Sequence, residues 1–361
     1  MKRLLIPYYQ FSERLDTIQL YIDMTFSKNN ELEHVENLLT KEIYKSVISY
    51  FKTLRTSTIQ YNAVVISLYG CFENFVDTLF SEYVNIVFEK SRNMEDIPPK
   101  MIAKYRLKVG EYLSAPQRFN AMDLSEIGVV TDYHNILTSC LTETINPKLL
   151  VSHSGNLHIS ELLGLMTDLG IENSKTSILD SHLLKKYFVE SVGIELKEFD
   201  LKKRRAASDI KNSELLEPLE RLVSQRNSVA HSWNEGNRIT AHDFSSAIIP
   251  FLGVLAKIVL EICFIELFKK IPESEYSFIN KSPINVFNKH ILCLNSQGIN
   301  LKSGDFILYK SNGKNKCSCI KNIQRNGKDI IEVKKEQSID IGIQLENTVK
   351  SEDEICYVIS G

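Results

Sequence analysis

The chain of 361 residues carries a formal net charge of -2, with 43% hydrophobic and 24% charged residues, which is the composition of an ordinary globular protein. Its length allows two or three domains. The near-neutral charge excludes a global positive field that would attract a polyanion, so any nucleic-acid partner has to be held by local basic clusters.

The N-terminal residues do not have the pattern of a secretory signal. The start, MKRLLIPYYQFSERLD, has only a short apolar run before Pro7 and no small-residue cleavage site. The most apolar stretch, residues 247–268, is interrupted by Pro250, Lys257 and Glu261, so it lacks the roughly 18 continuous apolar residues of a membrane-spanning helix. We therefore expect a buried helix there and no membrane partner.

The seven cysteines are odd in number and scattered, which does not indicate a disulfide framework and favours a reducing compartment, the cytoplasm. The one close pair, Cys317 and Cys319 in KCSCI, would share a face of a strand. The pair is either part of a zinc site, which needs about four ligands, or two small residues that face a core. No metal and no cofactor is predicted.

From about residue 12 to residue 270 the apolar residues recur at helical spacing. Breaks rich in turn-forming residues fall at 95–100, around Pro116, at 152–156 and at 234–238, so we expect about seven or eight helices. In the segment of residues 66–88, one apolar stripe comprises Leu68, Phe72, Phe75, Val76, Leu79 and Val84.

Short β-rich runs follow, with the turn signals SNGK and RNGK between several of them. The runs are FILYK, CSCIKNI, DIIEV, DIGIQL and EICYVIS. A small barrel would bury one face of these strands and protect their edges. The sequence thus predicts an α + β two-domain protein, with an all-α helical bundle over residues 1–280 and a small all-β barrel over residues 281–361.

Polar side chains stand beside the apolar stripe of one predicted helix, in ELLEPLERLVSQRNSVAHSW, residues 214–233. Asn227 and His231 are four residues apart and share a face, and the long side chain of Arg226 can swing round to meet them. The buried stripe comprises Leu215, Leu216, Leu219, Leu222, Val223 and Val229, with Ser213 as the expected N-cap.

These three residue types suit a phosphodiester substrate. Arg226 can fork onto two phosphate oxygens and stabilise the charge of a transition state, and His231 titrates near neutrality and can move a proton. Asn227 would bind the phosphate or fix the tautomer of His231. The spacing alone also fits a histidine that caps the helix and an arginine that is merely solvated.

The segment of residues 219–233, LERLVSQRNSVAHSW, resembles the Arg-x4-His signature of HEPN domains, particularly of the bacterial HEPN-like nucleases. Residues 68–83 are similar to the glutamate-bearing helix that precedes it in that family. Residues 154–171 resemble the segment between these helices. The resemblance implies metal-independent cleavage of RNA by a homodimer, in which Arg226 binds the phosphate, Asn227 assists and His231 is the general acid or base, leaving a 2',3'-cyclic phosphate.

Three further features depend on the same resemblance. Glu73 would match the family's glutamate and contact His231 or Arg226, unless Glu73 and Asp77 simply form a solvated face. Trp233 stands where a subset of the family has a modified tyrosine, so such regulation is not expected; it would either stack on a base or pack in the core. A basic run is either an RNA contact or a solvated loop, and it comprises Lys202, Lys203, Arg204 and Arg205.

The region of residues 285–361 resembles the β-barrel second domain of translational GTPases, which implies an accessory that binds tRNA, the ribosome or a protein. Positive charge there would come from Lys310, Lys314, Lys316, Lys321 and Arg325.

The sequence therefore predicts a cytoplasmic ribonuclease that is the effector of a toxin–antitoxin or antiphage system, with RNA, a second copy of the chain and an antitoxin or trigger protein as partners. The alternative is a HEPN-like module that binds RNA, nucleotide or protein without cutting. A metal-dependent hydrolase has little support, since His153 and His158 lie in a predicted loop without carboxylates at ligand spacing.

Overall fold

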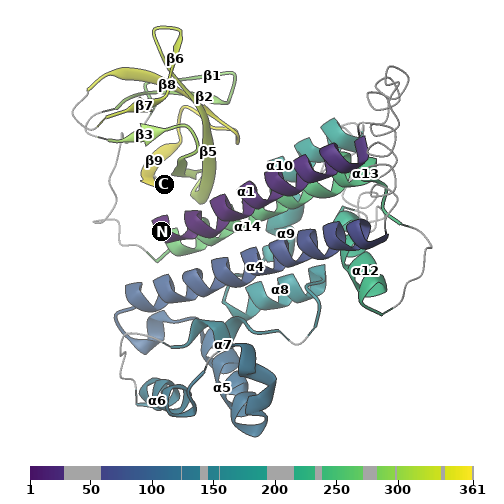
Figure 1. The fold of residues 1–361 in the computed structure, drawn as a ribbon. Coiled ribbons are helices and arrows are strands. Elements are labelled where there is room, and N and C mark those ends of the chain that lie inside the picture. Colours follow the sequence, from purple (N-terminus) through teal and green to yellow (C-terminus); the bar gives the residue numbers. More distant parts are fainter. Residues whose placement is uncertain are drawn as a thin grey trace, which may run out of the picture.

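A computed structural model describes residues 1–27, 58–122, 124–138, 145–153, 155–192, 215–231, 238–270, 283–296, 299–334 and 338–359. Helices occupy the chain up to Phe268, and strands follow from Asn285 (Figure 1). The α + β organisation predicted from the sequence, a helical region followed by a small antiparallel β structure, is confirmed.

The helices of the described residues vary from a single turn to 33 residues. The α-helices are α1 (Leu5–Ile22), α4 (Thr58–Lys90), α5 (Pro99–Ser114), α6 (Glu126–Leu137), α7 (Pro147–Val151), α8 (Ile159–Asp168), α9 (Ser174–Asp180), α10 (His182–Tyr187), α12 (Glu217–His231), α13 (Ala241–Asp243) and α14 (Ile249–Phe268). Short 3-10 or π segments are η1 (Lys2–Leu4), η2 (Asp23–Ser27), η3 (Met94–Asp96), η4 (Pro116–Met122), η5 (Phe188–Val192) and η8 (Phe244–Ile248).

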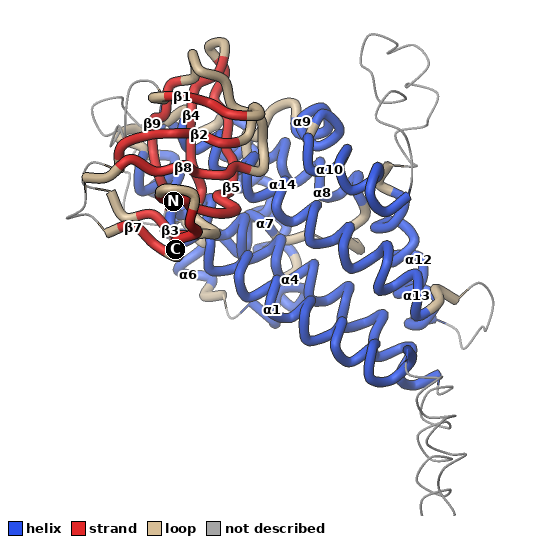
Figure 2. Tube along the Cα trace, turned by 90° about the horizontal axis from the view of Figure 1, so that it is seen from above, coloured by secondary structure: helices blue, strands red, loops and turns tan. Residues whose placement is uncertain are grey.

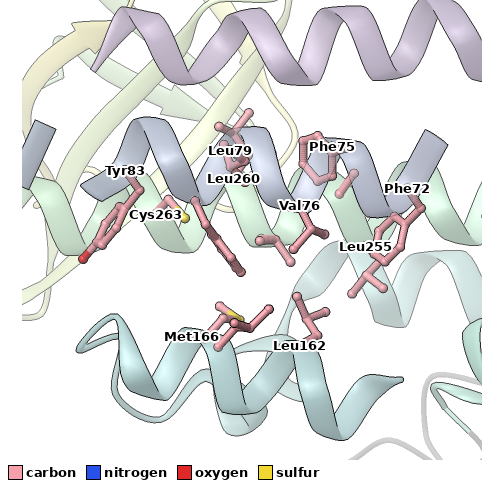
Figure 3. Packing of buried hydrophobic residues seen from close by; sticks show 14 of the residues in the cluster. Phe72, Phe75, Val76, Leu79, Tyr83, Leu162, Met166, Leu255, Leu260 and Cys263 are labelled. Carbon is pink, nitrogen blue, oxygen red and sulfur yellow. The ribbon is translucent and has the colours of Figure 1, made fainter. Parts of the chain in front are cut away.

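The long helix α4 is the centre of the helical region and packs against α1, α7, α12 and α14. Figure 3 shows apolar side chains of α4 and α14 together, with Leu162 and Met166 of α8 facing them. All six residues of the stripe predicted for this helix are buried. Because α4 has neighbours on several sides, its aromatic residues fill the core, and the hydrophobic effect of their burial is the main force that holds the bundle together.

Gly170, just after α8, has a positive φ of 77°, a conformation that costs side-chain-bearing residues energy. A Cβ at this position would also collide with the ring of Pro98, before α5. The Leu-Gly-Ile sequence at residues 169–171 therefore ends α8 where the chain must turn and pass close to Pro98.

The strands form an open antiparallel half-barrel in the order β1-β2-β8-β5-β4-β9, with β6 paired to β5 and a separate β3-β7 pair. Their bounds are β1 (Asn285–Phe287), β2 (Ile291–Asn295), β3 (Leu301–Lys302), β4 (Phe306–Ser311), β5 (Lys314–Arg325), β6 (Lys328–Ile330), β7 (Glu332–Val333), β8 (Asp340–Leu345) and β9 (Glu354–Ile359). The SNGK and RNGK turns are two-residue hairpin loops, because Asn312, Gly313, Asn326 and Gly327 all have positive φ.

The half-barrel shares a hydrophobic core with the helices. Phe306 and Leu308 of β4 and Cys317 and Cys319 of β5 pack in the helical core, whereas alternate residues of the same strands fill the interior of the half-barrel. The ring of Phe306 lies 5.3 Å from that of Phe264 on α14. Both faces of β4 are thus buried, which explains why FILYK reads as an almost continuous apolar run. The two cysteines face this core.

The two longest apolar helical segments lie inside the fold. Residues Thr58–Lys90 and Ala241–Phe268 are long and apolar enough to span a membrane by length and composition, but 56% and 72% of their most apolar windows are buried in the structure. Their apolar character is accounted for by the core that they build.

A carboxyl group is buried where α14 meets the half-barrel. Glu261 is 7% exposed, and its two carboxyl oxygens lie 3.4 Å from Nδ2 of Asn347. Burial raises the pKa of Glu261 to about 8, so this carboxyl group is protonated at neutral pH. The neighbouring Lys257 is paired with Glu346 at 2.6 Å.

The Glu261→Gln variant should be less sensitive to alkaline pH than the wild type. Between the ordinary pKa of 4.5 and the folded pKa of about 8, only the folded chain retains this proton, so the free energy of unfolding falls by about 1.4 kcal/mol per pH unit. Glutamine keeps the shape and cannot ionise. In urea unfolding measured from pH 5 to pH 8, the free energy of unfolding of the variant minus that of the wild type should rise by about this amount per pH unit. Glu352→Gln, at an exposed position, is the control, and parallel curves for Glu261→Gln and the wild type would contradict the buried-acid interpretation.

Candidate functional site

Arg226 is held on α12 against an aromatic ring of α4. Its guanidinium carbon lies 5.2 Å from the centroid of the Tyr69 ring, and Arg226 is half-buried. A cation over the face of a tyrosine ring is stabilised by about 0.5 to 2 kcal/mol, depending on how far it is desolvated. The contact fixes the position of the charged group while leaving part of it accessible.

Asn227 is held by the segment between α7 and α8. Its Oδ1 accepts hydrogen bonds from Nδ2 of Asn156 at 2.6 Å and from Nη1 of Arg226 at 3.4 Å. Because Oδ1 takes these two bonds, the donor of the Asn227 carboxamide is Nδ2. Arg226 and Asn227 therefore present positive charge and N–H donors side by side.

The hydroxyl group of Tyr69 connects Arg226 to the charged part of the site. It donates to Oε1 of Glu73 at 2.7 Å and accepts the backbone N–H of Leu157 at 2.8 Å. Burial, with the carboxylate of Glu73, raises the pKa of Tyr69 above its ordinary value, so it remains a neutral phenol. The ring of Tyr69 supports Arg226, and its hydroxyl group orients Glu73.

His153 forms a charged cluster with two carboxylates of α4. Its Nε2 lies 3.4 Å from Oδ1 of Asp77 and 3.9 Å from Oε1 of Glu73, and its Nδ1 lies 2.7 Å from the carbonyl oxygen of Gly155. The contact with Asp77 raises the pKa of His153 to about 9, against an opposing effect of burial. His153 is thus an imidazolium at neutral pH; its Nδ1 donates to Gly155, and its Nε2 forms ion-pair contacts with Asp77 and Glu73.

Two further contacts fix α12 in the bundle. Oε2 of Glu220 lies 2.6 Å from Nδ1 of His158, and its Oε1 accepts the backbone N–H of Ile159, the first residue of α8. On the other side, the hydroxyl group of Tyr61 on α4 donates to Gln225 at 2.7 Å. These contacts hold α12 in a defined rotation, which directs Arg226 toward Tyr69.

The structure brings together Arg226, Asn227 and, through Tyr69, Glu73. Glu73 and Asp77 are half-buried and face His153. His231 is the last residue of α12, so its backbone position is given, but its side chain is outside the part of the chain that is described. The other predicted substrate-binding residues and the expected N-cap lie outside the described residues: Trp233, Lys202, Lys203, Arg204, Arg205 and Ser213.

Tyr69, His153 and Asn156 were not assigned to the site from the sequence. Tyr69 reads as one more aromatic residue of a core helix, since its ring is buried and only its hydroxyl group is polar. The run SHSGNLH at residues 152–158 did contain a signal, because two histidines and an asparagine lie in a short break between helices. The run does not show which side chains of α4 and α12 these residues contact.

The site's chemistry is that of an anion-binding surface. Arg226 and Asn227 provide donors, while the imidazolium of His153 offsets one of the two negative charges of Glu73 and Asp77. Within the described ranges, no group of three or more His, Cys, Asp or Glu side chains is arranged to hold a metal ion. A phosphate or another oxyanion is the ligand that these donors fit.

Comparison with known proteins identifies one family. The sequence model described as RiboL-PSP-HEPN matches residues 23–264, more than half of the chain. The matched region contains α4, the segment between α7 and α8, and α12. Comparison with curated proteins gives no match, and comparison with solved structures gives none either.

The pKa of His153 provides a direct test of the charged cluster. Among the eight histidines, one imidazole should titrate near pH 9 in NMR spectra of the wild type, because Asp77 stabilises its protonated form. In Asp77→Asn the same resonance should move toward the ordinary value of 6.5. Glu220→Gln, beside His158, is the matched control and should leave that resonance in place. A His153 titration below pH 7 in the wild type would show that the cluster is not formed.

Proposed function

The chain belongs to the RiboL-PSP-HEPN family, and from this premise we propose that it is a metal-independent endoribonuclease. Membership of a HEPN family supports a nuclease-like or RNA-related function. The observation that carries the finer proposal is the geometry of α12, where Arg226 lies over Tyr69 beside Asn227, with His231 farther along the same helix.

Binding of the scissile phosphate is assigned to Arg226 and Asn227. The guanidinium offers several N–H donors in a fixed plane, which match the oxygens of a phosphodiester, and Nδ2 of Asn227 adds another donor. Tyr69 and Asn156 hold the two groups in place before substrate arrives. Such preorganised donors stabilise the additional negative charge of the transition state more than they stabilise the ground state.

Proton transfer is assigned to His231. As a neutral imidazole it takes the proton of a ribose 2'-OH while the 2' oxygen attacks phosphorus, and the bond from phosphorus to the 5' oxygen breaks. A protonated imidazole gives its proton to that leaving oxygen. The products are a 2',3'-cyclic phosphate and a 5'-OH, and no step uses a metal. In the homodimer that we propose, the two copies of His231 act as base and acid in one cleft.

The half-barrel is assigned a role in selecting the target or sensing a trigger. It lies at the opposite end of the helical region from α12 in both views of the chain (Figures 1 and 2). It therefore does not complete the Arg226 site of its own chain. The resemblance of residues 285–361 to the second domain of translational GTPases makes tRNA the substrate that we propose. The biological role that follows is a cytoplasmic toxin or antiphage effector, held inactive by an antitoxin or trigger protein.

Arg226→Ala and His231→Ala should each abolish most cleavage of end-labelled tRNA and total RNA in the presence of EDTA. Removal of an acid–base histidine costs about 10²- to 10⁴-fold in rate, and loss of a group that stabilises the transition-state charge costs about 10²- to 10³-fold. Arg226→Lys should also lose activity, because an ammonium group keeps the charge but not the planar fork. Initial rates and the chemical identity of the product ends are the measurements.

Two variants serve as matched controls. Arg221→Ala removes an arginine of the same helix that pairs with Asp243 at 2.9 Å, and His242→Ala removes an exposed histidine of α13. Both should retain nearly wild-type cleavage. Full activity of His231→Ala would refute the proposal. RNA binding without turnover by the wild type would favour a HEPN-like module that binds and does not cut.

A further inference from the structure

A cavity of about 480 Å³ lies between the helical region and the half-barrel, away from α12. Its walls come from α9 and the start of α10 on one side, α14 at the floor, and β4, β5 and the segment after β8 on the other side. Figure 2 shows α9 on the side of the helices that adjoins the strands. The volume is within the usual range of small-molecule sites, about 300 to 1,000 Å³.

The floor of the cavity is apolar and contains one polar group that is deeply buried. Ile258 and Ile262 of α14 are 2% and 6% exposed, and Glu261 lies between them in the sequence. Nδ2 of Asn347 donates to the carbonyl oxygen of Cys317 at 2.7 Å, which orients its carboxamide toward Glu261. The protonated carboxyl group offers both a donor and an acceptor beside aliphatic side chains. A flat heterocycle with polar edges is the kind of group that fits this combination.

The rim of the cavity contains two lysines and a histidine. His182 of α10 and Lys314 and Lys316 of β5 line it. Burial is the largest cause of the lowered pKa of His182, and nearby lysines act in the same direction, so this imidazole is neutral at neutral pH and the positive charge of the rim comes from the two lysines.

Acidic groups also lie around the cavity. Asp180 and Glu266 line it, with Glu266 paired to Lys269 at 2.5 Å, and Glu190 lies 3.5 Å from Lys186. Lys314 and Lys316 are two residues apart on β5, so both side chains lie on the face of the strand that lines the cavity. An anionic group at this part of the rim would be attracted by the ammonium groups of both Lys314 and Lys316.

We propose that this cavity binds a nucleotide, with its base on the α14 floor beside Glu261 and Asn347 and its phosphates against Lys314 and Lys316. Inorganic phosphate alone would make no use of the apolar floor, and an uncharged heterocycle alone would make no use of the lysines. Because the ligand joins α14 to β5, it stabilises the packing of the half-barrel on the helices. The site shares no residue with the Arg226 site, so it is independent of the proposed ribonuclease activity.

The test is isothermal titration calorimetry of the full chain with ATP, GTP and AMP as probes at constant ionic strength, with inorganic triphosphate as the comparison. A nucleotide should bind, and inorganic triphosphate should bind at least about tenfold more weakly, because it lacks the base. The double variant Lys314→Ala/Lys316→Ala should raise the Kd of the nucleotide by about tenfold or more. Ser177→Trp, at an exposed position of α9 that lines the cavity, should block binding by occupying its mouth.

Lys328→Ala/Lys350→Ala, which changes two exposed lysines of the same half-barrel, is the matched control and should bind like the wild type. Arg226→Ala should also bind nucleotide normally, which separates this result from the outcome of the cleavage assay. Absence of nucleotide binding at millimolar concentration would overturn the proposal. Equal affinity for inorganic triphosphate, or binding unchanged by Lys314→Ala/Lys316→Ala and Ser177→Trp, would also overturn it.

Discussion

The burial of α4 is the constraint on which the rest of the structure depends. A helix of 33 residues with neighbours on several sides cannot present a broad polar face, so its polar groups near α12 occupy a narrow line through Tyr69, Glu73 and Asp77, at four-residue spacing. His153 offsets part of the negative charge of Glu73 and Asp77, and the hydroxyl group of Tyr69 is hydrogen-bonded to Glu73 and to the backbone of Leu157. Arg226 is then placed by the same ring that closes the core. A substitution that changes the packing of the core around Tyr69 is therefore expected to move Arg226 as well.

The boundary between the helices and the half-barrel also combines apolar packing with a few enclosed polar groups. Apolar residues of β4 and β5 extend the helical core, yet the boundary also contains a neutral acid, Glu261, and the partly buried ion pair of Lys257 and Glu346. Ion pairs removed from water contribute little net stability compared with apolar packing, but they are costly to break. Because these polar groups add little stability to the boundary, a ligand bound there could strengthen the packing of the half-barrel on the helices.

The sequence predicted the helical region, the β structure and the apolar stripe of α4, because hydrophobic periodicity is a local property of the chain. The two Asn-Gly turns were also predicted from the sequence, because a two-residue hairpin turn needs positive φ at both central residues and Asn and Gly adopt it readily. The short strands β1, β2 and β3 were not predicted, because β2 and β3 pair with the distant strands β8 and β7, and β1 is a three-residue edge strand that pairs only with β2. For the site, Arg226 and Asn227 were found from a motif, whereas Tyr69, His153 and Asn156 depend on contacts between segments roughly 70 to 160 residues apart, which no local pattern encodes.

The central claim is that α12 directs attack of a ribose 2'-OH on the adjacent phosphate. The most direct measurement is the rate of cleavage of an RNA that carries a single 2'-deoxy nucleotide immediately 5' of a mapped cleavage site, compared with the all-ribose strand. Because the deoxy strand lacks the nucleophile, the account predicts that cleavage at that bond disappears while other sites are still cut. Cleavage of the deoxy strand at an unchanged rate would contradict the mechanism and would require another nucleophile, such as water.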